Sequence, residues 1–234
     1  MNIKIENISH VYDVDVLKNL NFELKGYQSV AIIGASGSGK STLLRLMSGL
    51  EKPTEGVMTI NETWVGSKTY KKNVGFVFQN HNLFPHLTLE RNISLILEKT
   101  RGFSKVAARE AALKYLSLVH LEDQVHKLPK NVSGGQAQRA SIARAFSLNP
   151  DIIFMDEPTA SLDPFLTFEV LSNVKELRNY GKSFVFVSHV ISFVKEFADY
   201  VVFMDQGRIV EHGLPSILEQ PKTPELQRYI SYLV

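Results

Sequence analysis

The chain contains no cysteine in its 234 residues. Disulfide bonds and thiolate metal sites are therefore excluded, and a reducing compartment is compatible with the composition. Long apolar runs are missing too, because none reaches the roughly 18 residues that a membrane span needs. The N-terminus alternates apolar and polar residues and has no signal-peptide core. We therefore expect a protein that is soluble, or peripheral to a membrane through a partner.

The chain also lacks an excess of charge of either sign. Its 26 basic and 24 acidic side chains leave a formal net charge of +2. That balance argues against a nucleic-acid partner and against a polybasic membrane anchor. The hydrophobic content of 44% allows a core to form, and the length suits one large domain or a domain with an inserted subdomain.

One glycine-rich segment, GASGSGKST, fits the phosphate-loop pattern. An apolar run at 29–33 precedes it and a helical pattern at 41–50 follows, which is the context that such a loop needs. Backbone N–H groups and the helix N-terminus would bind the phosphates, Lys40 would reach the β- and γ-phosphates, and Ser41 would hold Mg²⁺. A chance Gly/Ser-rich turn is the alternative. The expected nucleotide-binding residues are Gly34, Ala35, Ser36, Gly37, Ser38, Gly39, Lys40, Ser41 and Thr42.

Alternating strand and helix patterns predict an α/β fold with a largely parallel sheet covered on both faces. Strands are expected near residues 3–8 and at 16–24, 29–33, 57–60, 74–78, 152–155, 184–187 and 201–204. Helices are expected at 88–97, 104–118, 136–148, 164–179 and 191–197. Because 88–148 is mostly helical and interrupts the α/β pattern, we interpret it as a subdomain inserted into a core of 1–87 and 149–234, all within one domain spanning 1–234.

A second part of the site is predicted where the apolar strand DIIFMDE ends in two carboxylates. Ligands of open α/β sheets bind at the carboxyl ends of the strands. Asp156 is placed to hold the Mg²⁺ shell, and Glu157 is placed to polarise an attacking water. The alternative is a pair of solvated carboxylates, which the upstream phosphate loop makes less favourable.

The segment Ser133-Gly134-Gly135-Gln136 precedes a basic helix and can be either an anion cradle or a local helix cap. The three residues Ser-Gly-Gly alone favour the cap. Followed by Gln138-Arg139 and Ala143-Arg144-Ala145, however, the segment closely resembles the signature of ABC-type ATPases. So does the order of motifs along nearly the whole chain, which runs phosphate loop, Gln79, SGGQ, Asp156-Glu157, Ser161-Leu162-Asp163 and His189.

The resemblance implies a P-loop NTPase core with a mixed, mostly parallel central sheet, an N-terminal antiparallel β-subdomain and an inserted α-helical subdomain. It also implies a head-to-tail homodimer with ATP and Mg²⁺ between the phosphate loop of one copy and the signature of the other. The signature residues that would contact the partner's ATP are Ser133, Gly134, Gly135 and Gln136. Glu157, His189 and Gln79 would be catalytic.

The same resemblance assigns the remaining roles. Ser41, Gln79 and Asp156 would ligate Mg²⁺, and Asp163 would communicate across the dimer. Tyr12 would stack on adenine, although a lone tyrosine near a strand is more often a packing residue. Two departures from the family pattern are Val132, where leucine is usual, and Val190, where an acidic residue usually follows the histidine.

The histidines are divided by context. Four have no motif around them and are expected at the surface: His10, His120, His126 and His212. His81 and His86 follow Gln79 and are expected to face a partner.

Residues 82–88 and 203–213 are similar to ATPase subunits of bacterial polar amino-acid importers of the glutamine, histidine and arginine type. That similarity implies a peripheral subunit at the cytoplasmic face of the inner membrane, bound to two transmembrane permease subunits and served by a periplasmic or lipid-anchored solute-binding protein. Lipoprotein release, macrolide export and cell division remain alternatives within the family. Roles on DNA or ribosomes are disfavoured by the single ATPase unit, the absence of sustained heptads and the neutral charge.

Overall fold

The structure is a computed structural model that describes residues 1–160 and 162–232. The chain forms two compact units: the first comprises Met1–Val74, Phe154–Asp156 and Ser183–Val234, and the second Gly75–Ile153 and Glu157–Lys182. Ser161, the first residue of the expected Ser-Leu-Asp motif, lies outside the described residues. The subdomain limits expected at residues 88 and 148 stay predictions.

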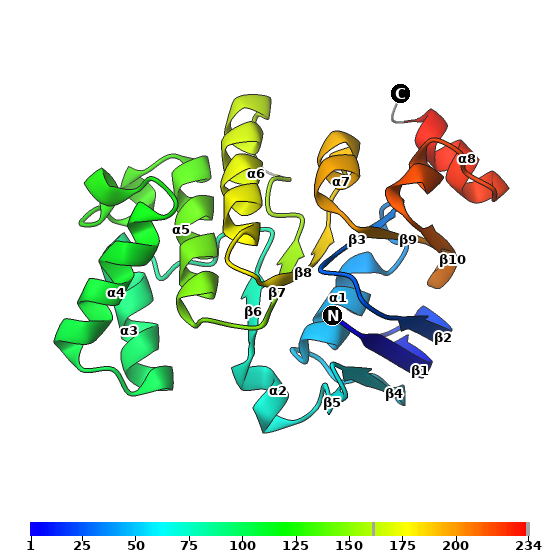
Figure 1. The fold of residues 1–234 in the computed structure, drawn as a ribbon, viewed down its shortest axis with the longest axis horizontal. Helices are drawn as coiled ribbons and strands as arrows, with labels where there is room; N and C mark the ends of the chain where they lie inside the picture. The colour runs from blue at the N-terminus through cyan, green and yellow to red at the C-terminus, as the bar shows by residue number, and fades with distance from the viewer. Residues whose placement is uncertain (161, 233–234) are drawn as a thin grey trace. The chain divides into compact units, whose positions relative to one another are not determined.

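An antiparallel sheet in the first unit has the strand order β2-β1-β4-β5 (Figure 1). Its strands are β1 (Ile3–Val11), β2 (Asp15–Leu24), β4 (Glu55–Ile60) and β5 (Thr63–Trp64). On β1 the residues Ile3 and Ile5 alternate onto the buried face, and an irregularity in the register between Ile5 and Ile8 brings Ile8 to that face as well. The expected N-terminal antiparallel sheet is therefore present.

His10 also belongs to the buried face of β1, where it is only 8% exposed. The prediction that His10 lies at the surface is thus wrong. Its ring meets the ring of Tyr12 edge to face, with 4.6 Å between the centroids. The sequence argument sorted the histidines by neighbouring motifs and did not consider on which face of a strand each one lies. A histidine on the apolar face of a strand is buried by the rest of the sheet.

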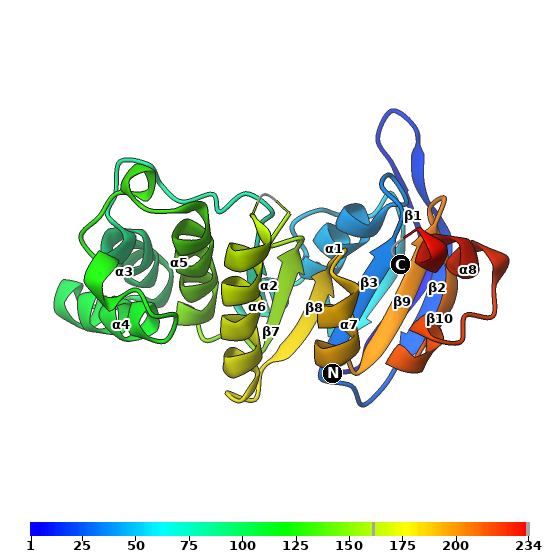
Figure 2. The same ribbon diagram turned by 90° about the horizontal axis from the view of Figure 1, so that it is seen from above.

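A mostly parallel sheet carries the phosphate loop in the first unit, with the strand order β10-β9-β3-β8-β7. The strands are β3 (Ser29–Gly34), β8 (Ser183–Val187), β9 (Tyr200–Asp205), β10 (Arg208–Gly213) and β7 (Ile152–Asp156), whose last three residues belong to this unit. Strand β3 runs parallel to both β8 and β9, and the three lie side by side in Figure 2. Because β3 is central, every one of its residues is buried.

The helices of the first unit are α1 (Lys40–Ser48), α2 (Lys68–Lys72), α7 (Ile191–Phe197) and α8 (Pro224–Ser231), with a 3₁₀ turn at Pro215–Leu218. Helix α7 packs its aromatic side chains on strand β8, where the Phe184 and Phe197 rings meet edge to face at 5.2 Å. Sequence reasoning missed α2, α8, β5 and β10. Helix α2 has only five residues, and the bond that the Tyr70 hydroxyl donates to Met47 O at 2.6 Å is a tertiary contact that no local pattern reveals.

The second unit is mostly helical. It contains β6 (Val74–Val77) apart from its first residue, α3 (Leu89–Arg101), α4 (Lys105–Ser117), α5 (Gly134–Ser147) and α6 (Pro164–Arg178), with 3₁₀ turns at Glu122–Gln124 and Pro129–Asn131. Consecutive helices from α3 to α6 pack against one another (Figure 1). Side-chain oxygens of Thr88, Ser104, Ser133 and Asp163 cap the four helices, which fixes where each begins.

Candidate nucleotide-binding and catalytic site

The phosphate loop leaves the carboxyl end of β3 and enters α1. Gly34 has φ +147°, and a Cβ there would lie 2.1 Å from Met204 O on the neighbouring strand β9. Only glycine fits at this position. Helix α1 begins after Gly39 without a side-chain cap and has no acidic residue in its first turn. Its first N–H groups are therefore suited to an external anion.

Two buried side chains inside the loop are suited to phosphate oxygens. Lys40 is buried, and its Nζ donates a hydrogen bond to the loop's own Ala35 O at 2.8 Å. The buried Ser38 hydroxyl oxygen has no hydrogen-bond partner. A buried polar group without a partner costs about 1–3 kcal/mol, and a phosphate oxygen would supply the missing bond. The loop therefore fits the phosphates of a nucleotide.

The two expected Mg²⁺ ligands of the first unit meet directly. Ser41 Oγ donates a hydrogen bond to Asp156 Oδ1 at 2.7 Å. Asp156 is only 4% exposed, and the Arg45 guanidinium lies 3.9 Å from its Oδ2. Within the described ranges there is no cluster of three His, Asp or Glu side chains. One carboxylate and one hydroxyl, completed by phosphate oxygens and water, is nevertheless a donor set that Mg²⁺ uses.

Strand register brings His189 to the same edge of the sheet as the phosphate loop. Ile32 of β3 pairs with Val187 of β8, and Gly34 and His189 each lie two residues further along. His189 is exposed. At Val190, where the family usually has an acidic residue, the backbone is held by the buried Ser188 hydroxyl, which accepts a hydrogen bond from Val190 N at 3.1 Å.

Tyr12 lies just beyond β1 and is 51% exposed. Its hydroxyl donates a hydrogen bond to the Glu51 carboxylate. Partial burial, followed by this bond, raises the pKa of the Tyr12 hydroxyl above its usual range. The ring is thus anchored at its hydroxyl while much of its surface remains accessible; adenine stacking stays a prediction.

The segment Ser133–Gln136 in the second unit forms a capping box at the start of α5. Ser133 Oγ accepts from Gln136 N at 3.2 Å, and Gln136 Oε1 accepts from Ser133 N at 3.0 Å. A Cβ at Gly135 would lie 2.9 Å from Leu166 Cδ2 of α6, so the glycine permits close helix packing. The local-cap interpretation is therefore correct for this chain by itself, and Ser133 is an exposed residue. Its contact with a partner's nucleotide stays a prediction.

Glu157 and Asp163 follow β7 in the second unit. Glu157 has φ +44°, a left-handed conformation that is uncommon for residues other than glycine and is often found at functional sites. Its carbonyl accepts from Ala160 N at 3.1 Å, which closes the turn. Asp163 caps α6, because its Oδ1 accepts from Leu166 N at 2.9 Å. Sequence reasoning had not given Asp163 this structural role.

The expected site residues are divided between the units. The first unit contains Tyr12, the phosphate loop, Asp156 and His189, and the second contains Gln79, the signature, Glu157 and Asp163. Gln79 directly follows Phe78, beyond the end of β6, and is exposed. Phe84, in the loop that Gln79 begins, is 41% exposed. Residues 82–88 include this aromatic side chain, which could have been a core residue of the chain itself, and its exposure argues against that.

Sequence reasoning named Gln138 and Arg144 within the signature pattern but did not foresee that they hold this loop, and it missed Asn92 altogether. Asn92 of α3 is fully buried, and Gln138 of α5 is almost so. Both bond to backbone groups at the ends of the loop, as does Arg144. The available signal was a polar side chain at an inward-facing helix position. Because buried polar groups are nearly always hydrogen-bonded, such a residue indicates a bonding partner nearby.

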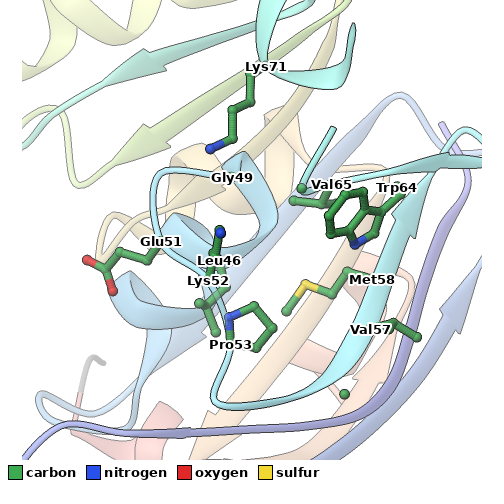
Figure 3. Close-up of a pocket in the computed structure, with 12 residues that line it drawn as sticks. Leu46, Gly49, Glu51, Lys52, Pro53, Val57, Met58, Trp64, Val65 and Lys71 are labelled. Carbon is green, nitrogen blue, oxygen red and sulfur yellow. The ribbon is translucent and has the colours of Figure 1, made fainter. Parts of the chain in front are cut away.

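A hollow of about 190 Å³ in the first unit was also missed. Figure 3 shows Trp64, Met58 and Val65 along one side, with Lys71 extending toward the hollow. The expected site residues described above do not line it.

His81, in the loop after Gln79, gives a pH-dependent prediction. Burial, and then the nearby Arg144 charge, lowers the pKa of its imidazole, and its Nδ1 accepts from Leu83 N at 3.3 Å. Because the folded pKa lies below the ordinary value of about 6.5, the folded state binds fewer protons than the unfolded state. The stability from neutral His81 is complete above pH ~6.5 and is lost as the pH falls below it.

We expect the melting temperature of the chain to fall less between pH 7.5 and 5.5 in a His81→Asn variant than in the original chain. Asparagine supplies an acceptor oxygen that does not titrate in this range. His126→Asn, at an exposed position, is the matched control and should leave the pH dependence unchanged. Identical pH dependence in the His81 variant and the original chain would contradict the assignment.

In the described part of the chain, no helix is both long and apolar enough to cross a membrane. A family model described as ABC transporter matches residues 17–160. The chain is similar to the arginine transport ATP-binding protein ArtM of Bacillus subtilis (strain 168), with 42% identity over 99% of this chain and 100% of that protein. It is 39% identical to the glutamine transport ATP-binding protein GlnQ of the same organism, over 99% of both chains.

Among solved structures, the chain resembles the ATP-binding cassette MJ0796 in a dimeric post-hydrolysis state bound to ADP and Pi. The TM-score is 0.81 at 34% identity, over 91% of this chain and 98% of that one.

Proposed function

The chain belongs to the ABC transporter family, and on that premise we propose that it is the ATP-hydrolysing subunit of a bacterial importer of polar amino acids. The observation that carries the ATPase part is the bond between Ser41 and Asp156 beneath a phosphate loop that contains an unpartnered Ser38 hydroxyl. The transport proteins for arginine and glutamine that it resembles support the solute class.

The residues of the phosphate loop would bind the phosphates of ATP first. Lys40 exchanges its bond with Ala35 O for bonds to the β- and γ-phosphates, and Ser38 donates its free hydroxyl. Ser41, Asp156 and Gln79 would hold Mg²⁺, which when bound offsets the negative charge on the phosphate oxygens. Tyr12 would contact the adenine ring.

Hydrolysis is proposed to depend on three side chains. Glu157 accepts a proton from the attacking water, Gln79 orients that water, and His189 donates a hydrogen bond to the γ-phosphate. The left-handed backbone at Glu157 costs about 1–3 kcal/mol. Such strain is often found where a catalytic side chain must be held in a fixed direction, which supports the role proposed for Glu157.

The working unit is proposed to be a head-to-tail dimer, as in the dimeric cassette that the chain resembles. Ser133, Gly134, Gly135 and Gln136 of one copy would bind the γ-phosphate held by the other, and Asp163 would lie near that interface. Two permease subunits would bind the dimer at the cytoplasmic face of the inner membrane, and a solute-binding protein would deliver the amino acid on the other side.

Co-purification tests this proposal. A tagged chain expressed from its own operon should bring down two hydrophobic membrane proteins, and deleting its gene should abolish uptake of one or more polar amino acids. Recovery without membrane proteins, together with unchanged uptake of all such amino acids, would overturn the transport role.

The proposed contact with the permease gives a further prediction, at the exposed part of the loop that follows Gln79. Phe84 and His86 are exposed and Leu87 is partly so, which suits a groove that receives a cytoplasmic helix of the permease. We expect His86→Asp to reduce uptake and solute-stimulated ATP hydrolysis, with little change in basal hydrolysis or melting temperature. His126→Asp, an exposed histidine of the same unit outside this loop, is the control. Unchanged uptake at unchanged stability would exclude His86 from docking.

A further inference from the structure

The loop from Gln79 to Leu87 is held at its start by side chains of helix α5. Gln138 Nε2 donates to Phe78 O at 3.0 Å. Arg144 donates through one guanidinium nitrogen to Asn82 O at 2.8 Å and through the other to His81 O at 3.1 Å. Both side chains belong to the helix that Ser133 caps, and all of these residues lie in the second unit.

The far end of the same loop is held by helix α3. Asn92 is 0% exposed, and its Oδ1 accepts from Phe84 N at 2.7 Å. Its Nδ2 lies 3.1 Å from both Phe84 O and Leu87 O. Side chains thus satisfy backbone groups that a loop normally leaves to water, so the loop is fastened to two helices at once.

The bonds from α5 are the ones that would move with the signature. The guanidinium group of Arg144 is planar and rigid, and two of its N–H groups donate to two successive carbonyl oxygens. It therefore fixes the orientation of the loop backbone relative to α5 as well as its distance. The amide of Gln138 is almost fully buried, where water cannot easily replace its bond. A rotation of α5 must therefore carry the backbone at Phe78, His81 and Asn82 with it.

We propose that Gln138 and Arg144 are positioning residues that fasten the Gln79 loop to α5, so that Gln79 and the Ser133 signature shift as one body. The roles of Gln79 and Ser133 rest on the proposed function, whereas the fastening rests on the bonds alone. Through it, a change at the γ-phosphate of one nucleotide reaches the signature that contacts the other. A loop free of these bonds would bind ATP but would place Gln79 less accurately for hydrolysis.

The test combines kinetics with hydrogen exchange on the full chain. Arg144→Met keeps the aliphatic stem and removes both bonds. In the assembled transporter its kcat for ATP hydrolysis should fall about tenfold or more, because misplacement of a catalytic group by about 1 Å costs up to 10²-fold. Its KM for ATP should change little. In the isolated chain, amides of residues 79–87 should exchange at least about tenfold faster, because the loss of even one of the two bonds to a charged donor is equivalent to that factor.

Arg101→Met is the matched control. Arg101 also donates from its guanidinium to a backbone carbonyl, that of Leu148, in the same unit. Its replacement should leave both kcat and exchange of the 79–87 amides unchanged. Arg144→Lys keeps the charge but not the two-pronged geometry and should restore the rate only in part, and it also serves if Arg144→Met does not fold.

Gln138→Met supplies an independent test. If both residues hold one loop, the double variant should lose less than the product of the two single losses. Exchange and kcat at original values in both single variants would overturn the proposal, as would faster exchange with unchanged kcat. If the assembled original chain does not hydrolyse ATP at all, the proposed function fails, while the exchange measurement still decides whether the loop is fastened.

Discussion

Replacing Glu157 with glutamine is expected to slow ATP hydrolysis by about 10²–10⁴-fold, the usual cost of losing a general base. Glutamine has nearly the same shape and fits the same left-handed backbone, so binding of ATP should persist. The variant should therefore accumulate as an ATP-bound dimer, because the nucleotide that holds the two copies together is not cleaved. Steady-state phosphate release and size-exclusion chromatography with ATP measure the two effects.

Two controls locate the effect at Glu157. Glu176→Gln, on the exposed surface of α6, removes a carboxylate of the same unit and should leave hydrolysis unchanged. Asp156→Asn removes the carboxylate that bonds Ser41 and should instead weaken Mg²⁺-dependent ATP binding. If Glu157→Gln hydrolyses ATP at the original rate, Glu157 has no part in the chemistry.

The second large effect concerns the composite site. Lys40→Ala should abolish useful ATP binding, because a buried ammonium opposite the β- and γ-phosphates is lost. Ser133→Arg should leave each copy able to bind ATP but block hydrolysis, because its long side chain occupies the place of the partner's nucleotide. A mixture of the two variants should regain activity, since a heterodimer contains one site made of two undamaged halves.

The cap at Ser133 dictates the control for this experiment. Replacing Ser133 with arginine or alanine loses the bond to Gln136 N, which costs about 0.5–2 kcal/mol of stability. Ser133→Ala suffers that loss without the steric block, so a difference between alanine and arginine isolates the effect on the partner's site. Normal hydrolysis by dilute Ser133→Arg monomers would refute the composite site.

Elements with strong periodic patterns were predictable. The central strand β3 has an apolar run at residues 30–33 because neighbouring strands pair with both its edges, and α3 to α6 begin at serine, threonine or aspartate caps. Helix α3 runs to Arg101, beyond the predicted end at Leu97, and stops at Gly102 in a left-handed conformation. A glycine after a helical pattern is a signal for the helix end, and placing the end of α3 at Gly102 would have given the correct boundary.

The parts that could not be predicted depend on tertiary contacts. The local signal for α2 is limited to the Ser67 cap, whereas the bond from its Tyr70 hydroxyl back to α1 is a tertiary contact. His10 lies two residues after the buried Ile8 on β1, but only the sheet shows that this face is covered. The motifs gave the identity of the site residues, but not the bond from Ser41 to Asp156 or the two bonds from Arg144 to the loop. Such bonds join residues far apart in sequence, and a single sequence carries no direct record of them.

The position of β3 also has a consequence for synthesis of the chain. Its hydrogen-bonding neighbours β8 and β9 begin only at Ser183 and Tyr200, so the ribosome makes the strand that bears the phosphate loop long before either partner. Until then β3 is an apolar segment with two unpaired edges, the type of segment that aggregates or is bound by chaperones. Truncated products that end before Ser183 therefore expose this strand, and the nucleotide site is completed only near the end of translation.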